Sequence, residues 1–139
     1  MNIIEKIKSG FILLDGAMGT MIQRYKLTEN DFRGERFADH GCELRGCNDL
    51  LCLTRPDVIS EIHTKYLEAG ADIIETNTFN AQRISMADFR LAAECREINL
   101  AAAKLARALA DEYTKKNPEK PRFVAGSVGP TSKTCSIMT

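Results

Sequence analysis

The chain has 139 residues, 44% of them hydrophobic, which is enough to form the core of one ordinary domain. Its 19 Lys and Arg balance its 19 Asp and Glu, and the charges are interleaved along the chain, which argues against a nucleic-acid partner. The apolar runs are far shorter than the roughly 20 residues of a membrane span, and five unevenly spaced cysteines without a secretory segment predict a reduced, cytoplasmic protein.

The first part of the chain predicts a helix, a strand and a long connection. Residues 2–9 place isoleucines on one helical face, and Gly10 ends that helix. The apolar run FILL, residues 11–14, predicts a buried strand because no polar residue alternates with it. Residues 24–53 form a long irregular passage. We interpret it either as a partial lid over a ligand site or as an excursion packed around the outer helices.

The remainder alternates helix and strand. From Thr54, TRPDVISEIHTKYLEAG predicts a helix with a threonine cap and a proline in its first turn, on which His63 is expected at the surface or boundary. ADIIET follows as a second buried strand. An apolar stripe from Leu91 to Tyr113 predicts a longer helix, closed by KKNPEKP, and RFVAGSVGP predicts a third buried strand.

This order predicts an α/β fold in which three parallel strands end at the same edge of one sheet. Each predicted strand is followed by a polar or glycine-rich loop: DGAMGT, ETNTFN and GSVGPT. Ligands of α/β proteins bind at the carboxyl ends of the strands. The three loops together therefore predict a single ligand pocket.

The residue types in these loops suit an amino-acid zwitterion. Asp15 and Glu75 follow strands that would lie about 4.8 Å apart as neighbours, so they could hold a cation, hold an ammonium group, or share a proton. Gly16 and Gly19 free the backbone to offer N–H groups to a carboxylate or phosphate. The alternatives are that Asp15 caps the next segment, that the glycines only turn the chain, and that Glu75 pairs with an arginine.

Other motifs are weaker. The loop Gly16-x-x-Gly19 is neither a dinucleotide-binding nor a Walker motif. Cys42, Cys47 and Cys52, near His40, are spaced more widely than the cysteine pairs of structural zinc sites, which favours buried or loop thiols over a metal. Cys135 is a weak candidate for a nucleophile.

Six blocks of sequence carry a family resemblance: LLDGAMGTMIQ, DFRGERFAD, CNDLLCLTRPDVI, AGADIIETNTFN, INLAAAKLARALADE and PEKPRFVAGSVGPT. Together they resemble the N-terminal homocysteine-binding module of the cobalamin-dependent methionine synthases, over roughly residues 8–136. Several blocks are specific to this branch. The first and last glycine loops alone would fit the wider homocysteine S-methyltransferase family, including its betaine-dependent members.

The resemblance implies a (β/α)8 barrel in which homocysteine lies at the carboxyl ends of the strands and its sulfur binds zinc. The thiolate would take a methyl group from methylcobalamin, which is regenerated from methyltetrahydrofolate on a separate domain. By the same resemblance, Asp15 would bind the ammonium group of homocysteine. The remaining matched positions in the substrate site are Gly16, Ala17, Met18 and Gly19 for its carboxylate, Glu75, Asn77 and Thr78 after the second strand, and Ser127, Gly129 and Pro130 after the third.

The sequence departs from the family pattern at the metal. The family's zinc ligands are a lone cysteine and a Gly-Cys-Cys motif late in the barrel, and this chain has no adjacent cysteines. A complete barrel takes about 250 residues, so we expect residues 1–139 to be the truncated N-terminal part of one domain, inactive alone.

The expected partners are homocysteine, the remaining barrel, and folate, cobalamin and reactivation domains. Open sheet edges predict self-association of the isolated chain. The alternative is a stand-alone α/β module for small-ligand binding or assembly.

Overall fold

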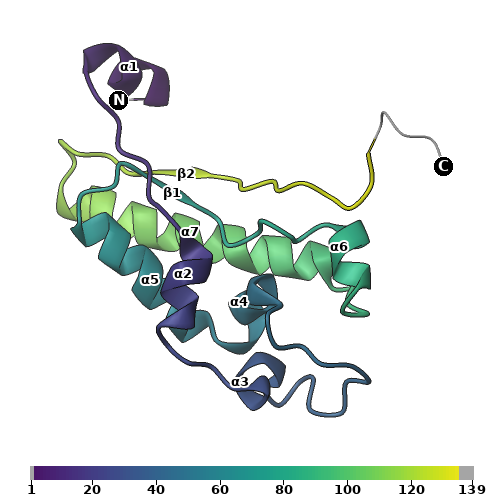
Figure 1. Ribbon diagram of the computed structural model, residues 1–139. Helices are drawn as coiled ribbons and strands as arrows, with labels where there is room; N and C mark the ends of the chain where they lie inside the picture. Colours follow the sequence, from purple (N-terminus) through teal and green to yellow (C-terminus); the bar gives the residue numbers. More distant parts are fainter. Residues whose placement is uncertain (1, 135–139) are drawn as a thin grey trace.

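The structure is a computed structural model that describes residues 2–134. A two-stranded parallel sheet lies on a layer of two long helices (Figure 1). The strands are β1 (Ile73–Glu75) and β2 (Phe123–Ala125), and the helices are α5 (Pro56–Glu68) and α7 (Cys95–Lys116). Ile74 of β1 pairs with Val124 of β2 and is fully buried against the helices. The α/β class and the parallel direction of the sheet are as predicted.

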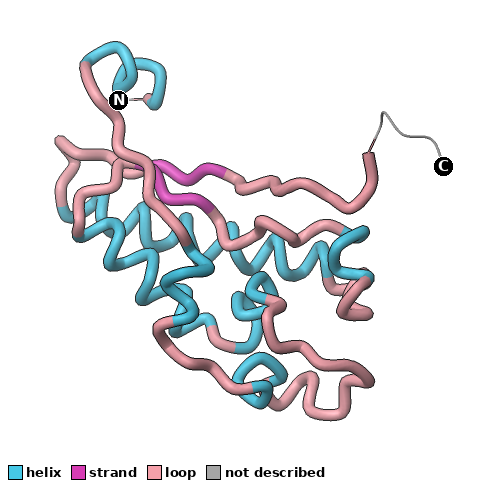
Figure 2. Tube along the Cα trace, viewed as in Figure 1, coloured by secondary structure: helices cyan, strands magenta, loops and turns pink. Residues whose placement is uncertain are grey.

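The first predicted strand is reduced to one pairing. Leu14 forms a single parallel bridge with Ile73, supported by hydrogen bonds from Asp15 N to Ile73 O (2.9 Å) and from Asp72 N to Leu13 O (2.8 Å). The segment 11–14 runs parallel to β1, as predicted. It is not buried as predicted, because Phe11 is 98% and Leu14 55% exposed. Figure 2 shows the reason: in the described part of the chain, helices cover only one face of the sheet. The third strand is likewise only half-buried.

The helices follow the predicted order with shifted ends. Pro56 opens α5, but Thr54 does not cap it, because Thr54 is the last residue of the preceding turn α4 (Leu51–Thr54). The helix α7 begins at Cys95 and not at Leu91, after the short helix α6 (Arg83–Ala87). The N-terminal helix α1 (Ile3–Ser9) has no buried residue and projects from the body (Figure 1). No helix within residues 2–134 is long and apolar enough to span a membrane.

The passage 24–53 is more ordered than predicted. After α2 (Met18–Gln23) it contains α3 (Glu29–Arg33), the 3-10 turn η1 (Asn48–Leu50) and the start of α4. Leu44, Leu50 and Leu51 are fully buried in the same core cluster as Ile59 and Ile62 of α5. Most of this passage therefore packs into the main core.

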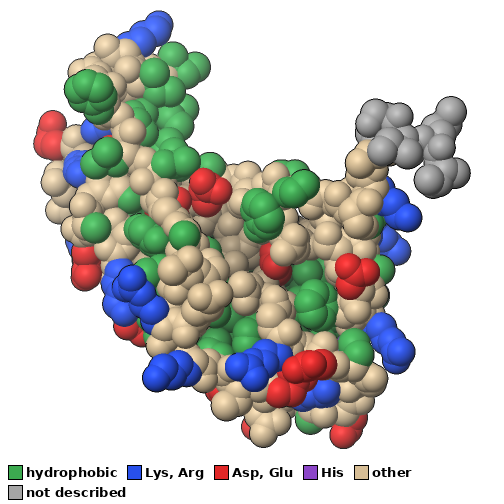
Figure 3. Space-filling view, viewed as in Figure 1, with side chains coloured by type: hydrophobic (Ala, Val, Ile, Leu, Met, Phe, Trp, Pro, Cys, Tyr) green, Lys and Arg blue, Asp and Glu red, His purple; other side chains and the backbone are tan. Residues whose placement is uncertain are grey.

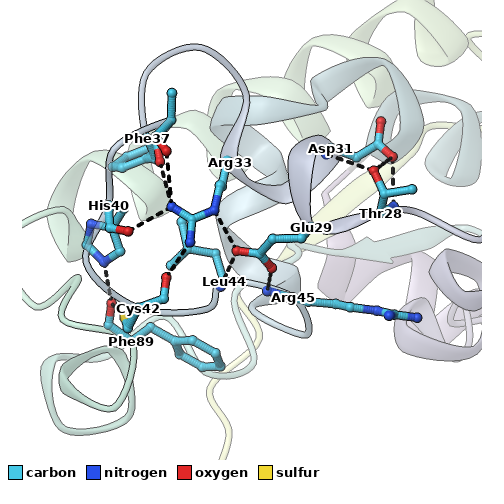
Figure 4. A network of polar contacts seen from close by, with 11 residues as sticks. Thr28, Glu29, Asp31, Arg33, Phe37, His40, Cys42, Leu44, Arg45 and Phe89 are labelled. Atoms are coloured by element: carbon cyan, nitrogen blue, oxygen red, sulfur yellow. Dashed lines mark hydrogen bonds and ion pairs between the residues drawn. The ribbon is translucent and has the colours of Figure 1, made fainter.

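An arginine holds the loop between α3 and η1 (Figure 4). Its guanidinium donates hydrogen bonds to four main-chain oxygens, those of Phe37, Ala38, His40 and Cys42. This residue, Arg33, also pairs with Glu29 (Nε to Oε1, 2.8 Å), and Glu29 accepts the N–H groups of Leu44 and Arg45. Since the loop has no strand or helix of its own, these contacts set its path to Asn48.

The position of His63 corrects the sequence interpretation. The side chain is 0% exposed, and neither ring nitrogen has a hydrogen-bond partner among the described residues. Since α5 packs against α2, α4 and α7, its buried surface is wider than the single stripe read from the sequence. Burial lowers the pKa of His63 to about 4, because the charged imidazolium would lose its hydration.

Candidate functional site

The loops after Leu14, β1 and β2 line one cavity of about 380 Å³ at the carboxyl edge of the sheet. Its wall includes nine of the predicted residues: Asp15, Gly16, Ala17, Met18, Gly19, Glu75, Asn77, Thr78 and Ser127. In the view of Figure 3, acidic side chains lie beside a hollow in the middle of the molecule. The sheet thus brings together three loops that lie far apart in the sequence.

Asp15 is the most unusual group in this cavity. Its Oδ2 accepts the N–H of Glu75 at 3.0 Å, while its buried Oδ1 has no partner among the described residues. Burial raises the pKa of Asp15 to about 6, with a smaller contribution from the Glu75 carboxylate and an opposing one from the Glu75 N–H. An unpartnered carboxylate oxygen in a half-buried site suits a cationic donor.

The alternative interpretations of these acids do not hold. The N-cap of α2 is Ala17, which makes no side-chain cap hydrogen bond, so Asp15 does not cap the following helix. Within residues 2–134, Glu75 forms no ion pair with an arginine. Within residues 2–134, neither carboxylate at the cavity wall is therefore paired with a cation.

The glycine loop packs closely against α5. A Cβ added to Gly16 would lie 3.2 Å from the hydroxyl oxygen of Tyr66, and that hydroxyl donates to the carbonyl oxygen of Ala17 at 3.1 Å. The N–H groups of Gly16 and Ala17 make no hydrogen bond to the rest of the described chain. The sequence predicted main-chain donors at Gly16 to Gly19, and the role of these N–H groups in binding stays a prediction.

Threonine hydroxyl groups tie the second loop to the third. The hydroxyl oxygens of Thr76 and Thr78 lie 2.7 Å apart, and Thr78 donates to the carbonyl oxygen of Ser127 at 2.9 Å. The N–H of Ser127 donates in turn to Thr76 Oγ1 at 3.1 Å. These side chains hold the cavity wall together, and their polar groups are already used.

Asn77 lines the cavity, whereas Gly129 contacts Phe79 from outside the wall. Asn77 donates its amide to the carbonyl oxygen of Asn48 at 2.8 Å. Gly129 donates its N–H to Phe79 O at 3.0 Å, and an added Cβ would lie only 2.3 Å from that oxygen. Gly129 and Pro130 are absent from the cavity wall.

The sequence interpretation did not name five residues of this cavity. Thr76, Phe79 and Asn80 lie within the predicted loop ETNTFN, whereas Asn48 and Asp49 reach the cavity from the passage 24–53. Asp49 is buried, its Oδ1 accepts the N–H of Asn80 at 2.9 Å, and burial raises its pKa. No local pattern marks Asn48 or Asp49, and only the lid interpretation pointed toward them. Both interpretations of the passage hold in part, since most of it packs into the core and residues 48–49 line the site.

The described residues do not suit a metal. Within residues 2–134, no three His, Cys, Asp or Glu side chains are grouped to hold an ion. Burial raises the pKa of Cys47 and that of Cys52 to about 12, which disfavours the thiolates that zinc binds. Cys135 lies outside the described residues.

Comparison with known proteins agrees with the geometry. The family model of homocysteine S-methyltransferase matches residues 12–138. The metallated form of the homocysteine methyltransferase MmuM from Escherichia coli is 28% identical with a TM-score of 0.68, and the match covers 91% of this chain and 40% of that one. The oxidised form is 29% identical with a TM-score of 0.65, covering 86% and 37%.

The matched part is thus well under half of these solved chains. It contains the cavity, both free carboxylates and the glycine loop, since the family match begins at residue 12. The chain therefore belongs to the homocysteine S-methyltransferase family.

Proposed function

We propose that this chain forms one wall of the amino-acid site of an enzyme that transfers a methyl group to homocysteine, giving methionine. The family membership and the cavity at the carboxyl edge of the sheet support this proposal. The observation that carries it is the buried, unpartnered Oδ1 of Asp15 at the cavity wall.

In this proposal the two ends of the zwitterion bind different groups. The ammonium group donates to Asp15, with Glu75 adding a second negative charge. The carboxylate accepts the free N–H groups of Gly16 and Ala17. A bound ammonium group lowers the pKa of Asp15 from about 6, so the carboxylate is fully ionised at neutral pH in the complex.

Sulfur activation needs residues that the described chain does not supply. The family resemblance implies zinc, but residues 2–134 offer no group of three metal ligands and their buried thiols Cys47 and Cys52 resist ionisation. We propose that the metal ligands and the rest of a (β/α)8 barrel lie in the part that the longer relatives carry beyond the match. The 139-residue chain is then inactive in methyl transfer by itself.

We further propose methylcobalamin as the methyl donor, regenerated from methyltetrahydrofolate. The support is in the sequence, where the blocks DFRGERFAD and CNDLLCLTRPDVI resemble the methionine synthase branch. Folate, cobalamin and reactivation domains are then the partners of this chain. Methyl transfer by the longer protein, assayed with each donor, tests this assignment separately from homocysteine binding.

The binding proposal is tested by nuclear magnetic resonance titration of the labelled chain with L-homocysteine, with and without zinc. We expect weak, zinc-independent binding with shifts confined to residues 15–19 and 75–78. Asp15→Asn should abolish these shifts, and Asp111→Asn, on the exposed face of α7, should leave them unchanged. The absence of shifts at these loops would refute the proposal. Tight binding of a different small ligand would favour the stand-alone module.

A further inference from the structure

A second cavity of about 380 Å³ lies beside the first, where the end of α2 and the helix α3 face the segment 45–48. Asn48 lines both cavities. The wall of the second cavity consists of Ile22, Gln23, Lys26, Leu27, Phe32, Arg45, Gly46 and Asn48. Its volume falls in the lower part of the range of small-molecule sites.

The floor of this cavity is apolar and belongs to the core. Ile22 is 3% exposed and Phe32 is 4% exposed, and half-buried Leu27 packs against the same cluster. Core side chains of this kind hold their positions in the absence of a ligand. The floor is therefore a preformed apolar surface.

The mouth of the cavity is cationic. Lys26 and Arg45 are exposed, and neither forms an ion pair within residues 2–134. Figure 4 shows the Arg45 side chain extending away from the carboxylate of Glu29. The wall contains no Asp or Glu.

Two acids near the cavity in the chain, Glu29 and Asp31, are already engaged, and exposed Glu43, two residues before Arg45, forms no ion pair with it within residues 2–134. Glu29 accepts the N–H groups of Leu44 and Arg45 and pairs with Arg33. Asp31 pairs with Arg55, Nη1 to Oδ1, at 2.7 Å. The positive charges of Lys26 and Arg45 are therefore not neutralised by these carboxylates.

We propose that this second cavity binds a small organic anion, with its carboxylate or phosphate group at Lys26 and Arg45 and its apolar body on Ile22, Leu27 and Phe32. Gln23 and Asn48 are the remaining polar side chains in its wall. The neighbouring homocysteine cavity has the opposite charge, with Asp15, Asp49 and Glu75 in its wall. The charged residues in the walls of the two cavities are therefore of opposite sign, and this second site does not depend on the function proposed above.

Three matched probes test the charge requirement. The labelled chain is titrated, by nuclear magnetic resonance, with 3-phenylpropionate, with 3-phenylpropan-1-ol and with phenyl phosphate. We expect both anions to shift the N–H signals of Leu27 and Gly46, and the neutral alcohol to bind at least fivefold more weakly. Equal binding of the alcohol, or the absence of shifts with 10 mM of either anion, would refute the proposal.

Charge variants test the position of the site. Lys26→Gln combined with Arg45→Gln should weaken 3-phenylpropionate at least tenfold, whereas Arg96→Gln with Lys104→Gln, exposed on α7, should leave its affinity unchanged. Thermal melting confirms that both double variants are folded. Asp15→Asn should leave this binding intact. Shifts mapping to residues 11–14, or tighter binding of an acidic peptide than of either anion, would contradict a small-molecule site at α2 and α3.

Discussion

Half-buried Asp15 and fully buried His63 have pKa values outside their usual ranges, and their effects on stability have opposite signs. The pKa of Asp15 is raised to about 6 in the folded protein. Its contribution to the free energy of unfolding is therefore most favourable at low pH and is lost as the pH rises through 6, where the half-buried carboxyl group ionises. The pKa of His63 is lowered to about 4, so the folded protein loses stability as the pH falls below 6.5.

Replacing Asp15 should separate binding from stability. Asp15→Asn keeps an acceptor for the Glu75 N–H and removes the cost of an ionised carboxylate in a half-buried site. We expect the variant to be more stable than the wild type by about 1 kcal/mol at pH 7.5, after allowance for solvent screening, and equal to it near pH 4. Urea unfolding at both values measures this. A variant that is less stable at pH 7.5 would contradict the argument.

The acid sensitivity of His63 can be tested by His63→Leu. Between pH 6.5 and pH 4 the unfolded chain takes up a proton that the buried ring does not, which costs on the order of 3 kcal/mol. The variant should lack this loss, and at pH 7.5 it should be at least as stable as the wild type because two unpartnered ring nitrogens are gone. Equal slopes of stability against pH in the two proteins would disprove the assignment.

Two loops without regular structure each depend on one residue that contacts the main chain of another segment or of the loop itself. Arg33 donates to four carbonyl oxygens in the loop after α3, and Gly129 allows the third strand loop to meet Phe79 O. Both contacts serve the cavity, since the first leads the chain to Asn48 and the second fixes the loop that carries Ser127. Two substitutions test these roles.

Arg33→Ala should destabilise the chain by about 2–4 kcal/mol, since it removes hydrogen bonds to three half-buried oxygens and one exposed oxygen and leaves Glu29 without its arginine. Hydrogen exchange should show lost protection at residues 37–47. Arg36→Ala is a matched control from the same segment, because its ion pair with Glu97 is half-exposed and worth at most about 1 kcal/mol. Equal losses in the two variants would show that Arg33 has no special role.

Gly129→Ala should lower stability by about 1–3 kcal/mol and displace the third loop, because its Cβ would lie 2.3 Å from Phe79 O. Gly126→Ala is the control three residues earlier, where an added Cβ meets nothing within 4 Å. Thermal melting of both variants gives the comparison. Unchanged melting of Gly129→Ala would rule out this close approach.

At the scale of helices and strands, sequence patterns predicted the long helices well and the burial of individual segments poorly. Hydrophobic periodicity found α5 and α7, because each carries apolar side chains at helical spacing that are buried. It overestimated the burial of FILL, since a pattern of apolar residues does not reveal whether a second layer covers them. It also placed His63 at the surface or boundary, because packing of α5 on three helices is a tertiary property. The roles of Asn48 and Asp49 depend on contacts across more than 25 residues and leave no local signal.

The whole molecule has one covered and one uncovered sheet face. Helices α5 and α7 lie on one side, while Phe11 (98% exposed) and Val128 (91% exposed) lie on segments that flank the sheet, and α1 shows further hydrophobic side chains (Figure 3). Apolar surfaces and short open strand edges of this kind promote association. We therefore expect the isolated chain to self-associate.

Sedimentation velocity at several concentrations measures this association. Phe11→Asp combined with Val128→Asp should shift the chain toward monomer by placing charge at the sheet edge. Ile84→Asp, on α6 and 42% exposed, should have no such effect. A monodisperse wild-type monomer with cooperative melting would contradict the expectation.

The hydrogen bonds of Arg33 determine which positions of the following loop tolerate substitution. The guanidinium contacts carbonyl oxygens, which every amino acid carries, so the turn from Phe37 to Cys42 keeps its course whatever side chains occupy its outward positions. One charged side chain thereby leaves a tolerant stretch of surface beside a fixed cavity. Tags, labels or cross-linking groups introduced at exposed Ala38 or Asp39 should accordingly leave the neighbouring cavities undisturbed.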